Sequence, residues 1–219
     1  LKIDDGSGLL YKAEDWTPST EFYGLDEQVS SNHKWAGYEL KYPDDNITEL
    51  TWMPLVNLIN LVAFSPDEEF INTIEEFLDI DNVIRYYIFI NLFKAMDNHG
   101  KNLHIIRYKK GYPFAFVPWD LDLTFGNDNV SWVSDPNINT IFTNNLFTRL
   151  KTLNVDEYKN KVKLTWEQIN KSDLLYQISN KFSININNLI ESNAIYRDND
   201  KWEFNTDYNY ELNEIINWI

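Results

Sequence analysis

The sequence predicts an α+β fold that is mostly helical, and three observations carry this prediction. Beyond residue 46, apolar side chains recur at helical spacing in several segments. One of these segments, from Val83 to Phe93, is apolar on almost every side, which is typical of a helix at the centre of a core. Two runs of β-branched and aromatic residues follow, over 103–108 and 112–117, with Gly111 in the short turn between them. This pattern predicts a β-hairpin.

Composition limits the classes of protein to consider. The chain has 219 residues, which predicts a single domain over 1–219, and 43% of them are hydrophobic, which is ample for a core. It has no cysteine, so disulfides and thiolate metal sites are excluded. The formal net charge of -15 disfavours nucleic acid and anionic membranes and favours basic protein partners. No run of about 18 apolar residues occurs, so we expect no membrane span.

The first 45 residues predict short strands and an irregular segment. A Gly6-Ser7-Gly8 turn precedes a strand that ends near Lys12, and this turn is an ordinary turn or a weak phosphate loop. Lys12 is a solvated strand lysine or a phosphate ligand. Glu21 and Glu27 are candidate ion-pair partners for Lys12, although both also fit a solvated surface.

Helices are expected next. The first covers Thr48 to Ala63, with Pro54 as an early kink or as a later true start. In Ser65-Pro66-Asp67-Glu68, we expect Ser65 to cap a second helix. Asp79 or Asp81 caps the apolar helix, which runs to about Phe93.

The second half of the chain reads as a polar loop followed by helices. The loop covers 127–145 and fits either a substrate-binding segment or a plain surface loop. Helices are predicted over 146–150, 155–169, from Ser172-Asp173 to Ile190, and from Asp207 to the end. The apolar stripe of the third of these helices predicts a core face.

Four oxygen-bearing side chains should meet at one end of the hairpin. Asp97 and Asn102 precede its first strand, and Asp120 and Asp122 follow its second. A hairpin brings its ends together, and three carboxylates at such range repel one another unless a cation neutralises them. Oxygen ligands without cysteine or clustered histidine suit Mg²⁺. Asp122 is either a second ligand or a residue that locks the loop.

Three neighbouring side chains are interpreted separately. His99 orients a substrate or a carboxylate, or is an ordinary loop histidine. Lys101 is a candidate to neutralise a transferring phosphate, although some kinases place such a lysine nearer the Asp. Trp119 is favoured as a packing residue.

The motif Asp97-Asn98-His99-Gly100-Lys101-Asn102, followed by Pro118-Trp119-Asp120-Leu121-Asp122 and Phe125-Gly126, resembles the spore coat protein H (CotH) kinase family. Gly8-Leu9-Leu10-Tyr11-Lys12 and the C-terminal segment extend the resemblance over most of the chain. It departs from ordinary protein kinases, because no His-Arg precedes Asp97 and Trp-Asp-Leu-Asp replaces Asp-Phe-Gly.

This resemblance implies a protein-kinase-like fold, with a truncated small lobe over 1–45 and a helical large lobe over 46–219. It implies that Asp97 is the catalytic base and that Asn102 and Asp120, with Asp122 as a candidate, hold Mg²⁺ or Mn²⁺. It also implies that Lys12 contacts the ATP phosphates and that Phe114 offers a ring to adenine.

The function implied is an atypical kinase that transfers the γ-phosphate of ATP to Ser or Thr of a protein. The family suggests a spore-coat or surface-associated substrate and the same location, and the acidic surface favours a basic substrate. Two other classes stay open. One is an inactive kinase-fold scaffold, which the lack of a clear Gly-rich loop keeps open and the presence of Asp97, Asn102 and Asp120 together argues against. The other is a small-molecule phosphotransferase or a metal-dependent phosphate hydrolase.

Overall fold

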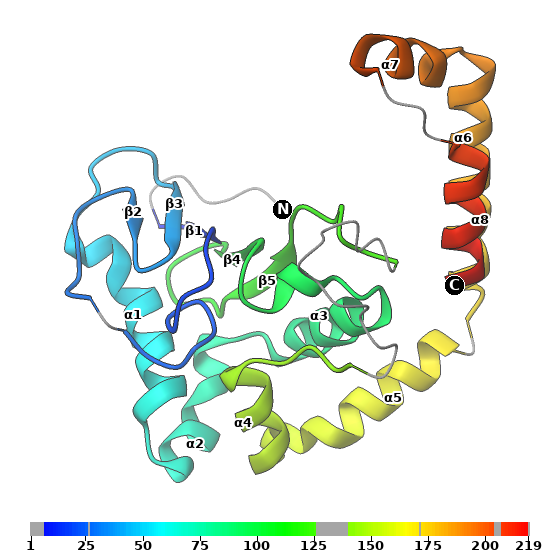
Figure 1. Cartoon of the computed structure of the whole chain (residues 1–219). Helices are drawn as coiled ribbons and strands as arrows, with labels where there is room; N and C mark the ends of the chain where they lie inside the picture. Colours follow the sequence, from blue (N-terminus) through cyan, green and yellow to red (C-terminus); the bar gives the residue numbers. More distant parts are fainter. Residues whose placement is uncertain (1–6, 26, 126–139, 171, 204–206, 219) are drawn as a thin grey trace. The chain divides into compact units, whose positions relative to one another are not determined.

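The computed structural model describes residues 7–25, 27–125, 140–170, 172–203 and 207–218. The chain divides into two compact units, Leu1–Thr165 and Trp166–Ile219. The predicted boundary at residue 45 falls inside the first unit. The α+β class is confirmed, with helices and one antiparallel sheet (Figure 1).

The first unit is built on a five-stranded sheet in the order β2-β3-β1-β4-β5. The strands are β1 (Leu9–Ala13), β2 (Lys34–Trp35), β3 (Tyr38–Tyr42), β4 (Leu103–Arg107) and β5 (Ala115–Pro118). Every neighbouring pair is antiparallel. The N-terminal strand β1 lies directly beside the hairpin strand β4, so the two predicted parts of the chain share one sheet.

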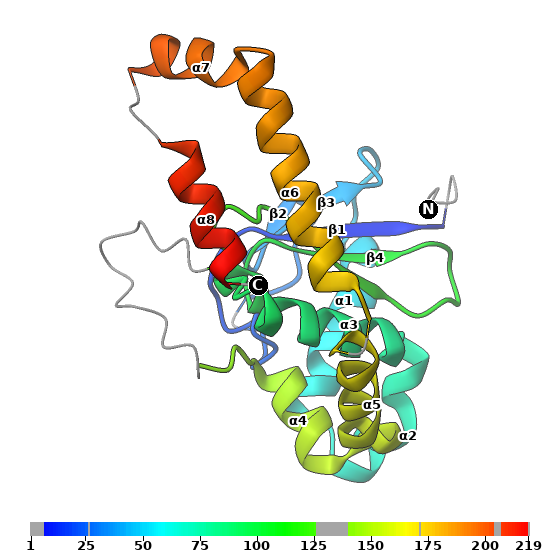
Figure 2. The ribbon, with the colours of Figure 1, turned by 90° about the vertical axis from the view of Figure 1, so that its right-hand side faces the viewer.

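One face of the sheet carries the core. Alternate residues of β1 are buried, including Tyr11, whose ring stacks on Trp52 of α1 (Glu49–Phe64) at 5.4 Å. Phe116 of β5 meets Tyr86 of α3 (Ile80–Leu92) edge to face at 5.5 Å. Figure 2 shows α1 and α3 on the same side of β1 and β4. The two-residue period of the strands therefore leaves the other face to polar side chains.

Three local expectations are corrected by the structure. Ser65 does not cap α2 (Asp67–Phe77), because it ends α1 and its hydroxyl donates to the Leu61 carbonyl. Of the two interpretations of Pro54, the later helix start is wrong, because Pro54 lies inside α1. The second hairpin strand begins at Ala115, later than predicted, because Phe114 instead pairs with the end of α2 through a bridge to Leu78.

Other expectations are confirmed. Asp79 caps α3, since its side chain accepts a hydrogen bond from the Asn82 backbone at 3.0 Å. The remaining elements of the first unit are the short helix η1 (Met96–His99), α4 (Asn145–Leu153) and η2 (Val155–Glu157). Helix α5 (Tyr158–Asn170) crosses into the second unit.

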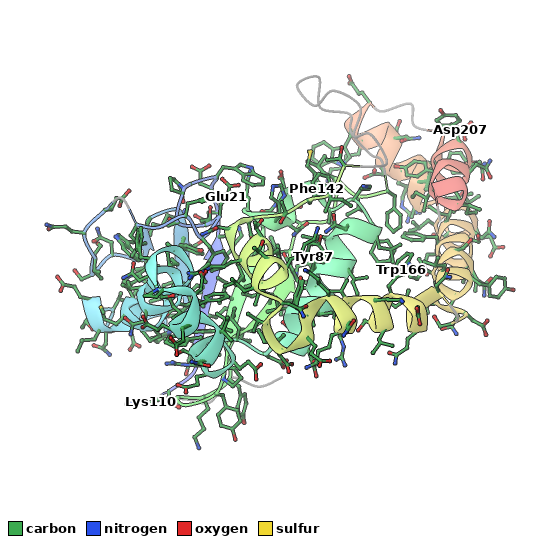
Figure 3. All side chains as sticks on the ribbon, turned by 90° about the horizontal axis from the view of Figure 1, so that it is seen from below. Glu21, Tyr87, Lys110, Phe142, Trp166 and Asp207 are labelled. Carbon is green, nitrogen blue, oxygen red and sulfur yellow. The ribbon has the colours of Figure 1, made fainter. Side chains whose placement is uncertain are left out.

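Side-chain and backbone hydrogen bonds fix α4 to the rest of the first unit. The Arg149 guanidinium donates to the Leu61 and Val62 carbonyls at the end of α1. The Asn145 backbone N–H donates to the Glu21 carbonyl at 3.1 Å. Figure 3 labels Glu21 and, on the segment that leads into α4, Phe142. This packing holds the segment before α4 beside the N-terminal loop.

The second unit consists of α6 (Leu174–Glu191), α7 (Ala194–Trp202) and α8 (Tyr208–Trp218), and α7 and α8 both contact α6. Asp207 accepts hydrogen bonds from the first turn of α8, so the predicted cap is confirmed. The predicted core face of α6 is wrong as stated, because no residue of this helix is fully buried. Helices α7 and α8 by themselves cover only part of the apolar stripe of α6. Among the described residues, no helix has both the length and the apolar character needed to cross a bilayer.

Candidate phosphotransfer site

The ends of three strands meet at one edge of the sheet, which we call the carboxylate end. Asn102, just before β4, donates its backbone N–H to the Ala13 carbonyl at 2.9 Å and accepts from the Trp119 N–H at 2.9 Å. Asn102 and Asp120 both adopt left-handed backbone angles, with φ of 51° and 55°. Asn and Asp tolerate this region better than most residues. The residue types at both junctions therefore suit the sharp turns there.

Asn98 holds the two loops of the carboxylate end together. Its side-chain amide donates to the Asn102 carbonyl at 2.7 Å and to the Trp119 carbonyl at 2.8 Å. The backbone carbonyl of Asn98 accepts a hydrogen bond from the Tyr86 hydroxyl at 2.6 Å, and only 1% of the residue is exposed. The sequence analysis missed this role, because a loop asparagine carries no sign of its partners.

Asp97 lies at the centre of the carboxylate end and is 9% exposed. Its Oδ2 atom lies 3.5 Å from Asn102 Nδ2 and 4.0 Å from Lys101 Nζ. Burial raises the pKa of Asp97; the charge of Lys101 opposes this, and the nearby charges of Asp122 and Asp120 add to it. Asp97 thus lies beside Asn102 and within electrostatic range of Asp120 and Asp122, while the roles of all four residues stay predictions.

The donor chemistry of the carboxylate end fits a hard divalent cation. Asp120 and Asp122 are exposed, and Asn102 adds an amide. Within the described ranges, however, no three His, Cys, Asp or Glu side chains are grouped to hold a metal ion. An ion here therefore needs further oxygen ligands from water or from a phosphate. Both interpretations of Asp122 stay open, since Asp122 also takes part in a further interaction.

Lys12 lies on the polar face of β1, opposite His104 of β4. Its ammonium group is 3.6 Å from a carboxylate oxygen of Glu14, which also bonds Lys34. Hydrogen bonding with Glu39 and then with Lys34 lowers the pKa of Glu14 to about 2. The partner of Lys12 is therefore Glu14 rather than either of the two glutamates considered from the sequence. Glu14 lies two residues after Lys12, directly beyond the end of β1, and this spacing is a signal that could have identified it.

His99 is packed rather than open to a substrate. Its ring lies 4.7 Å from the Trp16 ring and is stacked at 5.5 Å on Phe142, measured between centroids. Burial lowers the pKa of His99, and its Nδ1 atom is 2.6 Å from the Met96 carbonyl oxygen. A Cβ on Gly100 would lie 2.4 Å from the Trp16 ring, so the loop needs glycine for this contact. These features favour the structural interpretation of His99.

Trp119 differs from its predicted packing role. It is 54% exposed, and its ring meets His104 edge to face at 5.4 Å. An aromatic ring directly before Asp120 is therefore open to solvent at the carboxylate end.

Phe114 is not brought to the carboxylate end. It lies four residues before Pro118, roughly 13 Å away along the hairpin at about 3.3 Å per residue. The ring is 2% exposed and packs against Tyr11 and beneath the Arg107 guanidinium. A contact with adenine stays a prediction, and the packing supports a core role.

The comparison with known families agrees with the motif. The model of the CotH kinase protein family matches residues 2–219, which is nearly the whole chain. No curated protein matches the sequence. The family match includes β1, the hairpin and all the acidic residues of the carboxylate end, and the chain therefore belongs to the CotH kinase protein family.

Proposed function

We propose that the chain is an ATP-dependent kinase that phosphorylates Ser or Thr of a protein at the carboxylate end. Family membership supports a kinase-like activity. The observation that carries the proposal is the convergence of Asp97, Asn102 and Asp120 at the open end of the hairpin, with a strand lysine, Lys12, on the adjoining face. This is the set of groups that phosphoryl transfer requires for positioning and charge neutralisation.

Asp97 has the properties of a general base. In the proposed reaction, the substrate hydroxyl oxygen forms the new bond to the γ-phosphorus while the bond to the β,γ-bridging oxygen breaks. ADP leaves with that electron pair, and the hydroxyl proton passes to the Asp97 carboxylate. A carboxyl whose pKa is raised by burial is a stronger base than an ordinary aspartate, which favours this transfer.

The neighbouring residues would bind and orient the phosphates. Asn102 and Asp120 would hold Mg²⁺ or Mn²⁺, with Asp122 as a further candidate, and the ion would neutralise the phosphate oxygens. Lys12, kept in place by Glu14, would contact the phosphate tail. Lys101, 4.0 Å from Asp97, adds positive charge beside the base.

The acceptor is proposed from charge and family. A chain with a net charge of -15 attracts basic segments at long range, so a Ser/Thr-rich, basic protein is the favoured substrate. The family suggests a spore-coat or surface-associated protein and the corresponding location. Phosphorylation of a small molecule is the alternative if no protein accepts the phosphate.

Calorimetric titration with ATP, with and without Mg²⁺, tests the proposal directly. We expect binding that depends on Mg²⁺ and is lost in Asp120→Asn, since this change removes a charged oxygen ligand and keeps the side-chain shape. Asp45→Asn is the matched control, because Asp45 is an exposed aspartate in the loop that follows β3. This variant should bind ATP as the wild type does. Transfer of labelled phosphate to a basic Ser-containing protein then tests the acceptor.

Each outcome separates the candidate functions. Binding and transfer to protein support the kinase, whereas binding with transfer only to water or a small alcohol favours a hydrolase or a small-molecule enzyme. If ATP does not bind at all, the kinase proposal fails and a scaffold becomes the better explanation.

A further inference from the structure

The end of the sheet opposite the carboxylate end is surrounded by two adjoining cavities. The first, about 460 Å³, lies between β1, β3 and the first turns of α1. The second, about 530 Å³, lies between α1, α2 and the hairpin turn. Pro54, Asn57 and Arg107 line both cavities. We call this region the cationic end, because Arg107 and Lys110 line the first cavity.

Arg107 is a half-buried cation without a matching anion among the described residues. Its Nε atom is buried and has no hydrogen-bond partner, and its guanidinium lies 5.2 Å from the centre of the Phe114 ring. It forms no ion pair with any residue in the described part of the chain. Burial lowers the pKa of Arg107, and its neighbour Tyr11 is a neutral phenol whose own pKa is raised by burial. A buried N–H group of a charged side chain normally has an acceptor, so the lack of one among the described residues needs an explanation.

The charges around Arg107 distinguish the two cavities. Glu75 and Glu76 line the second, so an anion entering there would meet like charge. None of the described residues that line the first cavity is acidic; its polar groups include Ser7, Thr51 and Asn57, together with Lys110, which Figure 3 labels. In a chain of net charge -15, two cations and no carboxylate among the described lining residues are an unusual environment.

We propose that the first cavity is a binding site for an oxyanion, with Arg107 as the main ligand and Lys110 as a second cation. The guanidinium offers a planar fork of donors that matches a phosphate or carboxylate, and charged hydrogen bonds of this kind are the strong ones. Asn57 and Ser7 add neutral polar groups at the wall. The oxyanion is either a small free ion or a phosphorylated or acidic side chain of a protein. The site lies at the other end of β1 and β4, so it does not depend on the proposed kinase reaction.

The test is an amide-resolved NMR titration of the whole chain with sodium phosphate, with phosphoserine and with a phosphoserine peptide, at constant ionic strength. We expect saturable shifts of the Gly8, Asn57 and Lys110 amides in the Asp120→Asn background, which removes binding at the carboxylate end. Arg107→Gln should weaken binding by about tenfold or more, because a charged hydrogen-bond donor is lost. Lys110→Gln, at the exposed turn, should weaken it by a smaller factor.

Controls and a second variant keep the outcome decisive. Arg85→Gln removes an equal charge from an exposed position on α3 and should leave the affinity unchanged. If Arg107→Gln does not fold, Arg107→Lys retains the charge but loses the planar fork, and its affinity should fall. Tighter binding of the phosphopeptide than of free phosphate identifies a protein ligand, whereas equal affinity identifies a small oxyanion. Absence of saturable shifts in the wild type, or unchanged affinity in both the Arg107→Lys and Lys110→Gln variants, would overturn the proposal.

Discussion

The two ends of strands β4 and β5 carry opposite chemistry. At the carboxylate end, Asp97 lies near two further carboxylates and close to one lysine. At the cationic end, Arg107 is half-buried beside neutral aromatic rings, and Lys110 lies near it on the turn. Each end places like charges where simple electrostatics disfavours them. A short, rigid hairpin can thus keep an acidic cluster and a basic cluster apart, while the core beneath the sheet stabilises the fold.

What differs is how each arrangement is held. The carboxylate end is fixed by Asn98, whose buried amide bonds both loops, so the carboxylates cannot easily move apart. The cationic end lacks such a hydrogen-bonded clamp among the described residues and relies on ring packing. Local rules are broken most often at functional sites, which is the reason to test both ends.

The largest effect is expected for Asp97→Asn. Phosphoryl transfer should fall by about a hundredfold or more, because the amide cannot accept the hydroxyl proton, while binding of ATP with Mg²⁺ should persist. Transfer rates measured with saturating ATP, beside calorimetric affinities, separate the two quantities. An equal loss of binding in Asp97→Asn and Asp120→Asn would contradict the division of roles.

A large effect is also expected for Asn98→Ala. Two backbone carbonyls, of Asn102 and Trp119, lose their buried donor, so the free energy of unfolding should fall by roughly 2–3 kcal/mol. Asp120 should also shift, and transfer should fall with it. Denaturant unfolding and transfer assays check both expectations. Tyr86→Phe removes only the hydrogen bond to the Asn98 backbone carbonyl and leaves the Asn98 side chain in place, so it should cost about 1 kcal/mol with transfer retained.

Replacing one glycine near each end of the hairpin by alanine allows the two ends to be compared directly. In Gly100→Ala the new methyl group meets the Trp16 ring at 2.4 Å, so the loop of Asp97 must move and transfer should fall. In Gly111→Ala the methyl group meets nothing within 4 Å, and only the left-handed φ of 85° is penalised, at about 1 kcal/mol. Transfer assays on both variants are the measurement, and equal losses would show that the two ends are not independent.

The smallest effect concerns the pH dependence of stability. Burial raises the pKa of Asp97 in the folded protein. Ionising Asp97 is therefore less favourable in the folded than in the unfolded state, and its ionisation lowers the free energy of unfolding. This cost is absent below the unfolded pKa of about 3.9 and complete above the raised folded pKa. Asp97→Asn cannot ionise, so its stability relative to wild type should be greater at about pH 8 than at about pH 4. Urea unfolding at the two pH values measures the difference, and a reversed sign would contradict the burial of this carboxylate.

Several elements could be predicted from the sequence because their signals are local. The apolar helix α3, its cap at Asp79 and the turn at Gly111 each follow from side-chain period, capping chemistry or backbone freedom. The meeting of Asp97 with Asp120 followed from the hairpin alone. The cap at Ser65 failed because two helices compete for that residue, and local pattern does not decide between them.

The partners of individual polar residues could not be predicted in the same way. Any loop asparagine could have been the clamp, and only the tertiary structure places the Asn98 amide between the Asn102 and Trp119 carbonyls. The exposure of Trp119 and the burial of His99 likewise depend on neighbours from distant segments.

The sequence by itself determined most of the helices, the hairpin and the identity of the acidic residues at its end, since these depend on neighbours within a few positions. It did not predict α7. Only the tertiary structure decided that β1 pairs with β4, that Glu14 holds Lys12, and that the Nε atom of Arg107 is buried without a partner among the described residues. The physical reason is that burial and long-range hydrogen bonding depend on which surfaces meet, and many sequences with the same local pattern would pair them differently.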